Sequence, residues 1–185
     1  MDQKKLEQAA RLIIEAVGED PKREGLLETP RRFAEMVAEQ LAYAAVPNEE
    51  IARAFDKTFS SPESDMVVVK DISLFSHCEH HIALMYNMKA AVGYIPRGRV
   101  IGLSKIARIA DAVSKRLQIQ ERIGADIRDI MERITGAGDV IVLLEGEHSC
   151  MTARGIRKPG TLTRTISASG RFRTCLLYTS PSPRD

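Results

Sequence analysis

The chain contains few histidines and cysteines and lacks a long apolar run. Only four histidines and three cysteines occur in 185 residues, and no apolar stretch approaches the roughly 20 residues that a membrane span needs. The N-terminus also lacks the apolar core of a signal peptide. These absences favour a cytoplasmic protein without a membrane partner, in which cysteine and histidine together indicate a metal site more often than a disulfide.

An excess of charge of either sign is also absent. The 27 basic and 25 acidic side chains leave a net charge of +2, which argues against a nucleic-acid partner or a general membrane-surface role. A hydrophobic content of 44% and a charged content of 28% are ordinary for a globular protein. The length suits a single core that is large enough to fold alone, although assembly into oligomers stays open.

Apolar periodicity predicts helices first, then a pair of strands, two more helices and a final pair of strands. The helices are expected over residues 6–17, 29–41, 48–55, 104–117 and 123–134, and the strands over 66–75, 88–94, 140–144 and 161–168. This order indicates an α+β fold rather than alternating β-α-β units. We divide the chain into an N-terminal helical segment, residues 1–60, and a second domain, residues 61–174.

Residues 175–185 differ from the rest of the chain, because they show neither a capping signal nor any periodicity. Their letters match one reading frame of an adapter used in transposon-based sequencing libraries. We interpret them as a non-native tail and expect the native C-terminus to be missing. The alternative is a disordered native tail, and the encoding codons would decide between the two.

All four histidines and two of the three cysteines fall within two short windows, residues 77–81 (His-Cys-Glu-His-His) and 147–150 (Glu-His-Ser-Cys). Cys78 and His81 are three residues apart and can face one point from a single turn, and Cys150 would add a third ligand. Thiolate and imidazole are the donors that zinc prefers. A site with three protein ligands leaves a position for water, whose pKa the ion lowers.

Two versions of this zinc site stay open. In one, His80 and His148 are acid–base groups beside an open site, since imidazole titrates near physiological pH. In the other, His80 or His148 is a fourth ligand and the site is closed and structural. His77 is expected in a loop or outside the ligand set.

Basic residues suggest a second function, the binding of a polyanion. Arg32, Lys105, Arg108 and Arg154 could bind phosphates, and Ser104 opens a predicted helix whose free N–H groups favour an anion. A solvated basic face is the alternative. Glu121 could accept two hydrogen bonds from a guanine edge, although a glutamate on a helix surface often has no specific partner.

Six motifs, in their order along the chain, resemble the GTP cyclohydrolase I family. They are GEDPKREGLLETPRR at residues 18–32, CEHH at 78–81, GYIP at 93–96, GLSKIAR at 102–108, QIQER at 118–122 and HSCMTARG at 148–155. The resemblance extends over residues 6–174. It implies a tunnelling fold in which an antiparallel sheet carries helices on one side and the subunits form a ring, typically a homodecamer of two stacked pentamers with active sites between subunits.

The resemblance also implies an activity and a cofactor. The family converts GTP and water to formate and 7,8-dihydroneopterin triphosphate, the first step of tetrahydrofolate biosynthesis, at a Zn2+ site. Position by position, the resemblance implies that zinc is held by Cys78, His81 and Cys150, and that protons are transferred by His80 and His148. It implies that the guanine is held by Glu121 and Gln120. The rest of the substrate, chiefly its triphosphate, would be bound by Leu103, Ser104, Lys105, Arg108, Arg154 and Arg32.

The chain departs from the family pattern at three places. Residues 82–88 stand where the family often has Pro-Phe followed by Gly, which we expect to alter a loop. Glu35 lies one helical turn beyond Arg32, where a basic residue is common, and a carboxylate there should weaken any phosphate contact of this helix. The family's short C-terminal helix is replaced by residues 175–185.

Two other functions are compatible with parts of this pattern. The nitrile reductase of the queuosine pathway shares the fold but uses a cysteine nucleophile and NADPH. A zinc-stabilised regulator that binds GTP without turnover is the other. Both cysteines, both window histidines and the 120–122 segment (Gln-Glu-Arg) are retained, which favours the cyclohydrolase.

Overall fold

The computed structural model describes residues 1–174, and these form two compact units that divide between Ala44 and Ala45. The expected tail, residues 175–185, lies outside the described residues. In the described part of the chain, no helix has both the length and the apolar character needed to cross a membrane.

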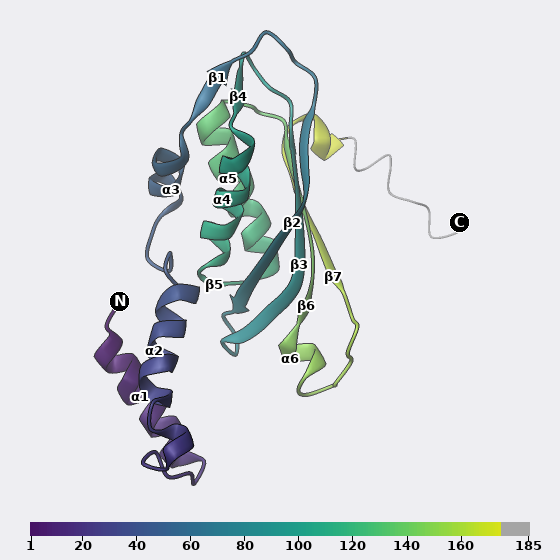
Figure 1. Cartoon of the computed structure of the whole chain (residues 1–185). Helices are drawn as coiled ribbons and strands as arrows, with labels where there is room; N and C mark the ends of the chain where they lie inside the picture. The colour runs from purple at the N-terminus through teal and green to yellow at the C-terminus, as the bar shows by residue number, and fades with distance from the viewer. Residues whose placement is uncertain (175–185) are drawn as a thin grey trace. The chain divides into compact units, whose positions relative to one another are not determined.

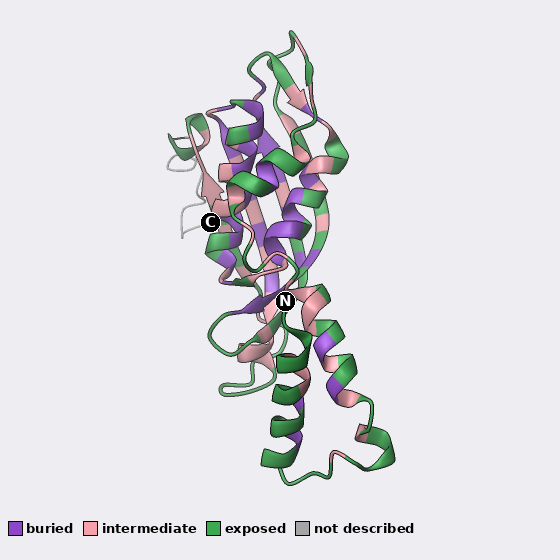
Figure 2. Cartoon of the chain, turned by 90° about the vertical axis from the view of Figure 1, so that its left-hand side faces the viewer, coloured by how far each residue is buried: buried purple, intermediate pink, exposed green. Residues whose placement is uncertain are grey.

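The first unit is a pair of helices, α1 (Gln3–Ala16) and α2 (Thr29–Gln40), joined through a short 3-10 helix, η1 (Glu24–Leu26). The Asp2 side chain accepts a hydrogen bond from the Lys5 backbone N–H at 3.1 Å and so caps α1. Few side chains of this unit are buried, chiefly Ala10 and Ala34. In Figure 2 α1 is mostly exposed, whereas α2 is partly covered.

The second unit contains a five-stranded sheet in the order β5-β2-β3-β6-β7, and every neighbouring pair is antiparallel except β2 and β5. Its elements are α3 (Asn48–Phe55), β1 (Thr58–Ser60), β2 (Val67–Cys78), β3 (Ala83–Tyr94), β4 (Arg99–Ile101), α4 (Leu103–Ser114), β5 (Leu117–Gln118), α5 (Gln120–Thr135), β6 (Val140–His148), α6 (Ser149–Thr152) and β7 (Thr163–Ala168). The strands β1 and β4 form a separate antiparallel pair.

The helices α4 and α5 lie side by side on one face of the sheet (Figure 1). Isoleucines at helical spacing on α5 and alternating residues of β6, such as Val142, are fully buried between the two layers. The expected α+β class, with helices on one side of a mainly antiparallel sheet, is confirmed. The helix α3 packs on α4 and α5 and belongs to the second unit, whereas the sequence placed it in the N-terminal segment.

Two expectations about individual elements are wrong. Leu117 was expected on the buried side of a helix, but α4 ends at Ser114 and Leu117 is 39% exposed in β5. Residues 82–88 were expected to form a loop, but β3 begins at Ala83. An extra residue in β3 breaks the two-residue alternation before Lys89, so the pattern of the later part of the strand does not extend back to its start.

Asp139 joins the two ends of the chain segment that contains β6 and β7. Its buried carboxylate accepts hydrogen bonds from the backbone N–H of Arg171 at 2.7 Å and from Arg171 Nε at 3.1 Å. These hydrogen bonds hold the pKa of Asp139 below its ordinary value, and the one from the backbone has the largest effect. Gly170 has a φ of 53°, and any side chain there would collide with Asp139.

Replacing Asp139 by Asn should therefore lower the free energy of unfolding by about 1.5–3 kcal/mol at pH 7, because charge-assisted hydrogen bonds are lost. A carboxyl whose folded pKa is lowered stabilises the protein above its unfolded pKa of about 3.9, and this stability is lost as the pH falls through the folded value. Urea unfolding at pH 7 and below pH 4 should show the two proteins converging in acid.

The control for this prediction is Asp71→Asn, since the Asp71 side chain is 73% exposed. Its unfolding free energy should stay within about 0.5 kcal/mol of the wild type. Equal stability of Asp139→Asn and wild type at pH 7 would contradict the assignment.

Candidate active site

The first window lies at the end of a β-hairpin. Cys78 is the last residue of β2 and is buried, and residues 79–82 form the turn to β3. His80 and His81 are exposed on this turn, and Nδ1 of His80 lies 3.5 Å from Sγ of Cys78. Ile82 completes the turn with a φ of 51°, a left-handed conformation that is costly for a β-branched residue.

The strand β3 brings the second window to this hairpin. Cys78 pairs with Ala83 at the start of β3, and His148, the last residue of β6, pairs with Met85. Cys150 follows on the short helix α6. Burial raises the pKa of the Cys150 thiol, and the adjacent Cys78 thiol raises it further. The two cysteines, distant in sequence, are therefore in contact.

The third expected ligand has a different partner. Nε2 of His81 lies 3.1 Å from a terminal guanidinium nitrogen of Arg154, and within residues 1–174 no three His, Cys, Asp or Glu side chains are gathered closely enough to hold a metal ion. The donor types nevertheless fit zinc, because two thiols are in contact and two imidazoles stand on the adjoining turn. Zinc binding through His81 would require its imidazole to exchange Arg154 for the metal.

His148 is held by a buried amide. Its Nε2 lies 2.9 Å from Oε1 of Gln120, the first residue of α5, which is 1% exposed. The amide nitrogen of Gln120 donates to the backbone carbonyls of Leu144, at 3.2 Å, and Thr163, at 2.9 Å. Because those carbonyls can only accept, the amide orientation is fixed and its oxygen must face the imidazole. Nε2 of His148 is therefore the protonated nitrogen, and Nδ1 is left as the basic one.

The surroundings of His148 favour the neutral imidazole. Burial lowers its pKa, and the nearby Glu121 carboxylate partly opposes this shift. A neutral imidazole with a fixed tautomer can accept a proton at neutral pH. Glu121 itself is exposed on the first turn of α5, next to His148, where it can reach a bound molecule.

Of the two alternatives for His77, the loop is wrong. It lies in β2 and is buried, and burial lowers the pKa of its imidazole. Its Nδ1 has no hydrogen-bond partner among the described residues. His77 thus contributes to the packing beneath the hairpin, while the histidines that follow it face outward.

The residues expected to bind the triphosphate are not all at this end of the sheet. Arg154 is beside His81, but Ser104 and Lys105 lie at the start of α4, next to β4, while the end of α4 leads to β5, which pairs with Cys78. Since α4 has 12 residues, its two ends are about 18 Å apart. Leu103 and Arg108 share this first half of α4.

Arg32 belongs to α2 of the first unit, where it is exposed. Glu35 forms an ion pair with Arg31, at 2.7 Å, rather than with Arg32.

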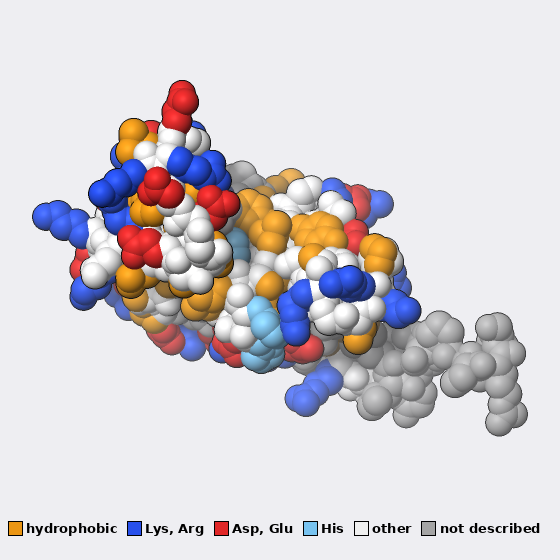
Figure 3. Space-filling view, turned by 90° about the horizontal axis from the view of Figure 1, so that it is seen from below, with side chains coloured by type: hydrophobic (Ala, Val, Ile, Leu, Met, Phe, Trp, Pro, Cys, Tyr) orange, Lys and Arg blue, Asp and Glu red, His pale blue; other side chains and the backbone are white. Residues whose placement is uncertain are grey.

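The surface of the molecule in Figure 3 shows histidine side chains next to basic ones, in keeping with the exposed imidazoles of the hairpin turn.

One feature of the site was missed by the sequence analysis. Arg122 forms an ion pair with Glu79 in the hairpin turn, and its Nε donates to Oε1 of Gln118 at 2.8 Å. The backbone N–H of Glu79 donates to the carbonyl of Gln118 at 3.0 Å. These contacts attach the turn that carries His80 to α5. Their only signal in the sequence was the QIQER motif, in which roles were assigned to Glu121 and Gln120 but not to Gln118 or Arg122.

The chain is similar to known proteins over most of its length. The family model for GTP cyclohydrolase I matches residues 6–176. GTP cyclohydrolase 1 of Clostridium acetobutylicum is 56% identical over 178 residues, which are 94% of this chain and 91% of that protein. GTP cyclohydrolase 1 of Clostridium botulinum strain Kyoto is 55% identical over 180 residues, 94% of this chain and 92% of that protein.

Among solved structures, the archaeosine synthase QueF-Like in its apo form is 18% identical to this chain, with a TM-score of 0.46. The match covers 60% of this chain and 96% of that one. A similarity this low supports no conclusion about the site.

The fixed orientation of Gln120 yields a prediction for its isosteric variant, Gln120→Glu. A carboxylate would face the carbonyls of Leu144 and Thr163 without a proton to donate, so its folded pKa should lie above the unfolded value of about 4.3. The variant should lose more than about 2 kcal/mol of unfolding free energy at pH 8. Because the neutral acid can donate, this loss should shrink as the pH falls toward 5.

The matched control is Glu121→Gln at the next, exposed position, which should change the unfolding free energy by less than about 0.5 kcal/mol. Chemical denaturation of both variants between pH 5 and pH 8 checks the prediction. A loss for Gln120→Glu that does not depend on pH would show that the amide is not oriented as described.

Proposed function

Since the chain belongs to the GTP cyclohydrolase I family of enzymes, we propose that it hydrolyses GTP to formate and 7,8-dihydroneopterin triphosphate with the help of zinc. The observation that carries the proposal is the meeting of the two windows. Cys78 and Cys150 are in contact, and His80 and His148 lie on the segments that adjoin them. The reaction would be the first step of tetrahydrofolate biosynthesis and would take place in the cytoplasm, where thiols stay reduced.

Cys78, Cys150 and His81 would hold the zinc ion. Thiolates and imidazole are suitable donors, and a site with three protein ligands keeps one position open. When bound, zinc would supply a water molecule of lowered pKa and polarise it for attack on C8 of the purine. A closed site with His148 as fourth ligand through Nε2 is less compatible with the geometry, since Gln120 engages that nitrogen.

The two histidines would move protons during opening of the imidazole ring and loss of formate. His148 would accept a proton at Nδ1, because Nε2 is occupied by Gln120, and its lowered pKa keeps it in the basic form. His80 is exposed on the turn beside Cys78, where it can exchange protons with the substrate and with solvent.

The substrate would bind between charged groups of opposite sign. Glu121 would accept hydrogen bonds from the guanine edge, with Gln120 behind it. Arg154 would bind the triphosphate once His81 turns to the metal. The buried Gln120 amide already has protein partners on both ends, so any contact with guanine is expected to be secondary to its contact with His148.

A second copy of the chain would complete the site. Leu103, Ser104 and Lys105 lie at the far end of α4 from the β5 strand that pairs with Cys78, about a helix length away, and Arg108 lies near the middle of that helix. Within the described residues, the edge strand β7 pairs only with β6, and β2 is covered on its outer side only at His77 and Cys78. Such open edges favour pairing between copies, which supports the tunnelling-fold ring and its decamer of two pentamers. Arg32 is also proposed to contact the triphosphate.

Formate release from GTP tests the proposed function. Zinc-loaded protein should release formate, and protein treated with a chelator should not, because the nucleophile needs the metal. GTP binding without formate release, in a protein shown to contain zinc, would favour the GTP-binding regulator. Consumption of NADPH with a nitrile substrate would favour the reductase.

Complementation tests whether the site is shared between copies. The variants His148→Ala and Lys105→Ala should each be inactive, since one lacks the base and the other a phosphate contact. When they are unfolded together and reassembled at equal amounts, about a quarter of the sites should contain both native residues. Formate release should therefore return to about a quarter of the wild-type rate.

Reassembly of each variant alone is the control and should give no formate. His148→Ala should also keep its zinc, because His148 is not assigned as a ligand. An inactive mixture of well-assembled variants would contradict a site built from two copies.

A further inference from the structure

A bulge in β3 determines which side chains reach the second window. Tyr86 pairs with Glu147 of β6, but the next two residues, Asn87 and Met88, face the single Gly146. Asn87 has a φ of 51°, in the left-handed region that asparagine tolerates better than most residues. A side chain on Gly146 would come within 2.6 Å of Met88 Cγ, so the glycine allows the bulge to pack.

The bulge directs two hydrogen-bond donors to one carboxylate. Asn87 Nδ2 donates to Oε1 of Glu147 at 2.9 Å, and the Tyr86 hydroxyl donates to Oε2 at 3.2 Å. The backbone N–H of Gly160 also donates to Oε2, at 3.3 Å. Because the tyrosine proton is used by the carboxylate, the Thr152 hydroxyl, 2.9 Å away, must donate to the tyrosine oxygen.

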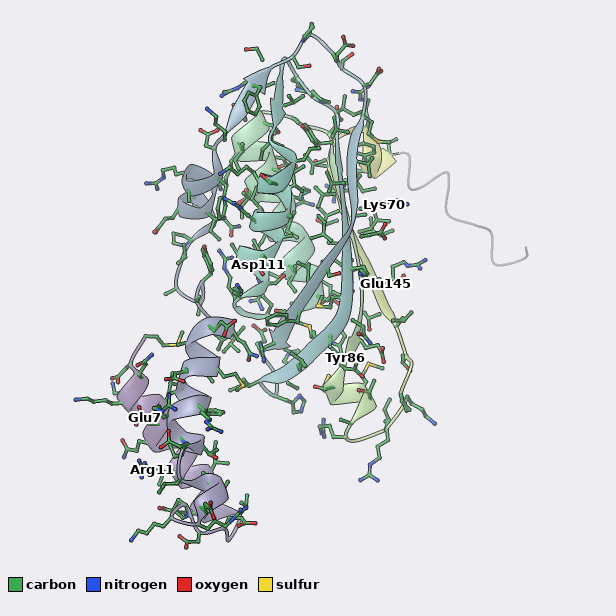
Figure 4. The ribbon with its side chains drawn as sticks, in the orientation of Figure 1. Glu7, Arg11, Lys70, Tyr86, Asp111 and Glu145 are labelled. Atoms are coloured by element: carbon green, nitrogen blue, oxygen red, sulfur yellow. The ribbon has the colours of Figure 1, made fainter. Side chains whose placement is uncertain are left out.

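These contacts close the segment 152–160, which contains Arg154. Thr152, at one end of this segment, hydrogen-bonds to Tyr86, and Gly160, at the other end, hydrogen-bonds to Glu147. The segment begins two residues after Cys150. Figure 4 shows Tyr86 on β3 beside α6. The segment therefore depends on side chains of β3 for its position, since its own exposed residues bury little surface.

We propose that Tyr86 and Asn87 are positioning residues that hold Cys150 and Arg154 in place through Glu147. The inference rests on the proposed function, because it gives those two residues their roles in zinc and triphosphate binding. Tyr86 and Asn87 lie within residues 82–88, where the chain departs from the family pattern, so the resemblance gave no indication of this role.

Hydrogen exchange of the full-length zinc-free protein tests the proposal. Tyr86→Phe removes only the hydroxyl, and Asn87→Gly removes the amide while allowing the left-handed backbone. Each variant should speed amide exchange in residues 149–160 about fivefold, the effect of losing one typical hydrogen bond on a local opening equilibrium. Exchange in α4 should not change.

Matched variants separate positioning from general destabilisation. Lys89 lies on β3, like Tyr86, and donates a hydrogen bond of 2.6 Å to Ser73 of β2. Lys89→Gln disrupts this contact and should leave exchange in residues 149–160 at the wild-type rate. Thr152→Val should resemble Tyr86→Phe, Thr152→Ser should restore slow exchange, and Tyr86→Phe combined with Thr152→Val should add little to either.

Zinc affinity and steady-state kinetics provide the functional readout. Both β3 variants should bind zinc about threefold to tenfold more weakly in competition with a chelator, and zinc-saturated enzyme should show a raised KM for GTP through Arg154. Wild-type exchange in both variants, or faster exchange throughout the second unit, would overturn the proposal. Exchange needs neither zinc nor GTP, so a wild-type protein that releases no formate overturns the proposed function alone.

Discussion

The pairing of β3 with both β2 and β6 is the constraint on which the candidate site depends. The register of this three-strand ladder sets Cys78 opposite the start of β3 and His148 two residues further along it. Both windows thereby meet at one end of the sheet although about 70 residues separate them in sequence. A shift of one residue in either ladder would turn these side chains to the other face, so the core that fixes the register also fixes the chemistry.

The end of β6 uses strand alternation to hold its functional residues from two sides. His148 reaches the helix-covered side, where the buried Gln120 amide fixes its tautomer. Glu147, the preceding residue, points to the opposite face and is held by the bulged segment of β3. Neither the Gln120 contact nor the contacts of Glu147 with β3 take part in the chemistry itself. Both restrict the motion of short segments that bury little apolar surface of their own.

Much of this arrangement could be predicted from the sequence. Isoleucines at helical spacing identified α5, alternation identified the later part of β3, and the clustering of histidine and cysteine indicated that the two windows would meet. The short strand β5 and the start of β3 could not be predicted, because two residues carry no periodicity and a bulge reverses the alternation. The contacts of Gln120 and Tyr86 were also beyond prediction. They depend on a backbone orientation that only the assembled sheet and helices define.

X-ray absorption at the zinc edge of the zinc-loaded protein tests most directly the claim that the two windows form one metal site. The account predicts two sulfur ligands at about 2.3 Å and nitrogen at about 2.0–2.1 Å, with the remaining scattering from a light atom. Replacing Cys150 by Ser should reduce the sulfur count to one. A wild-type spectrum with fewer than two sulfur ligands, or a Cys150→Ser variant that keeps two, would contradict the account.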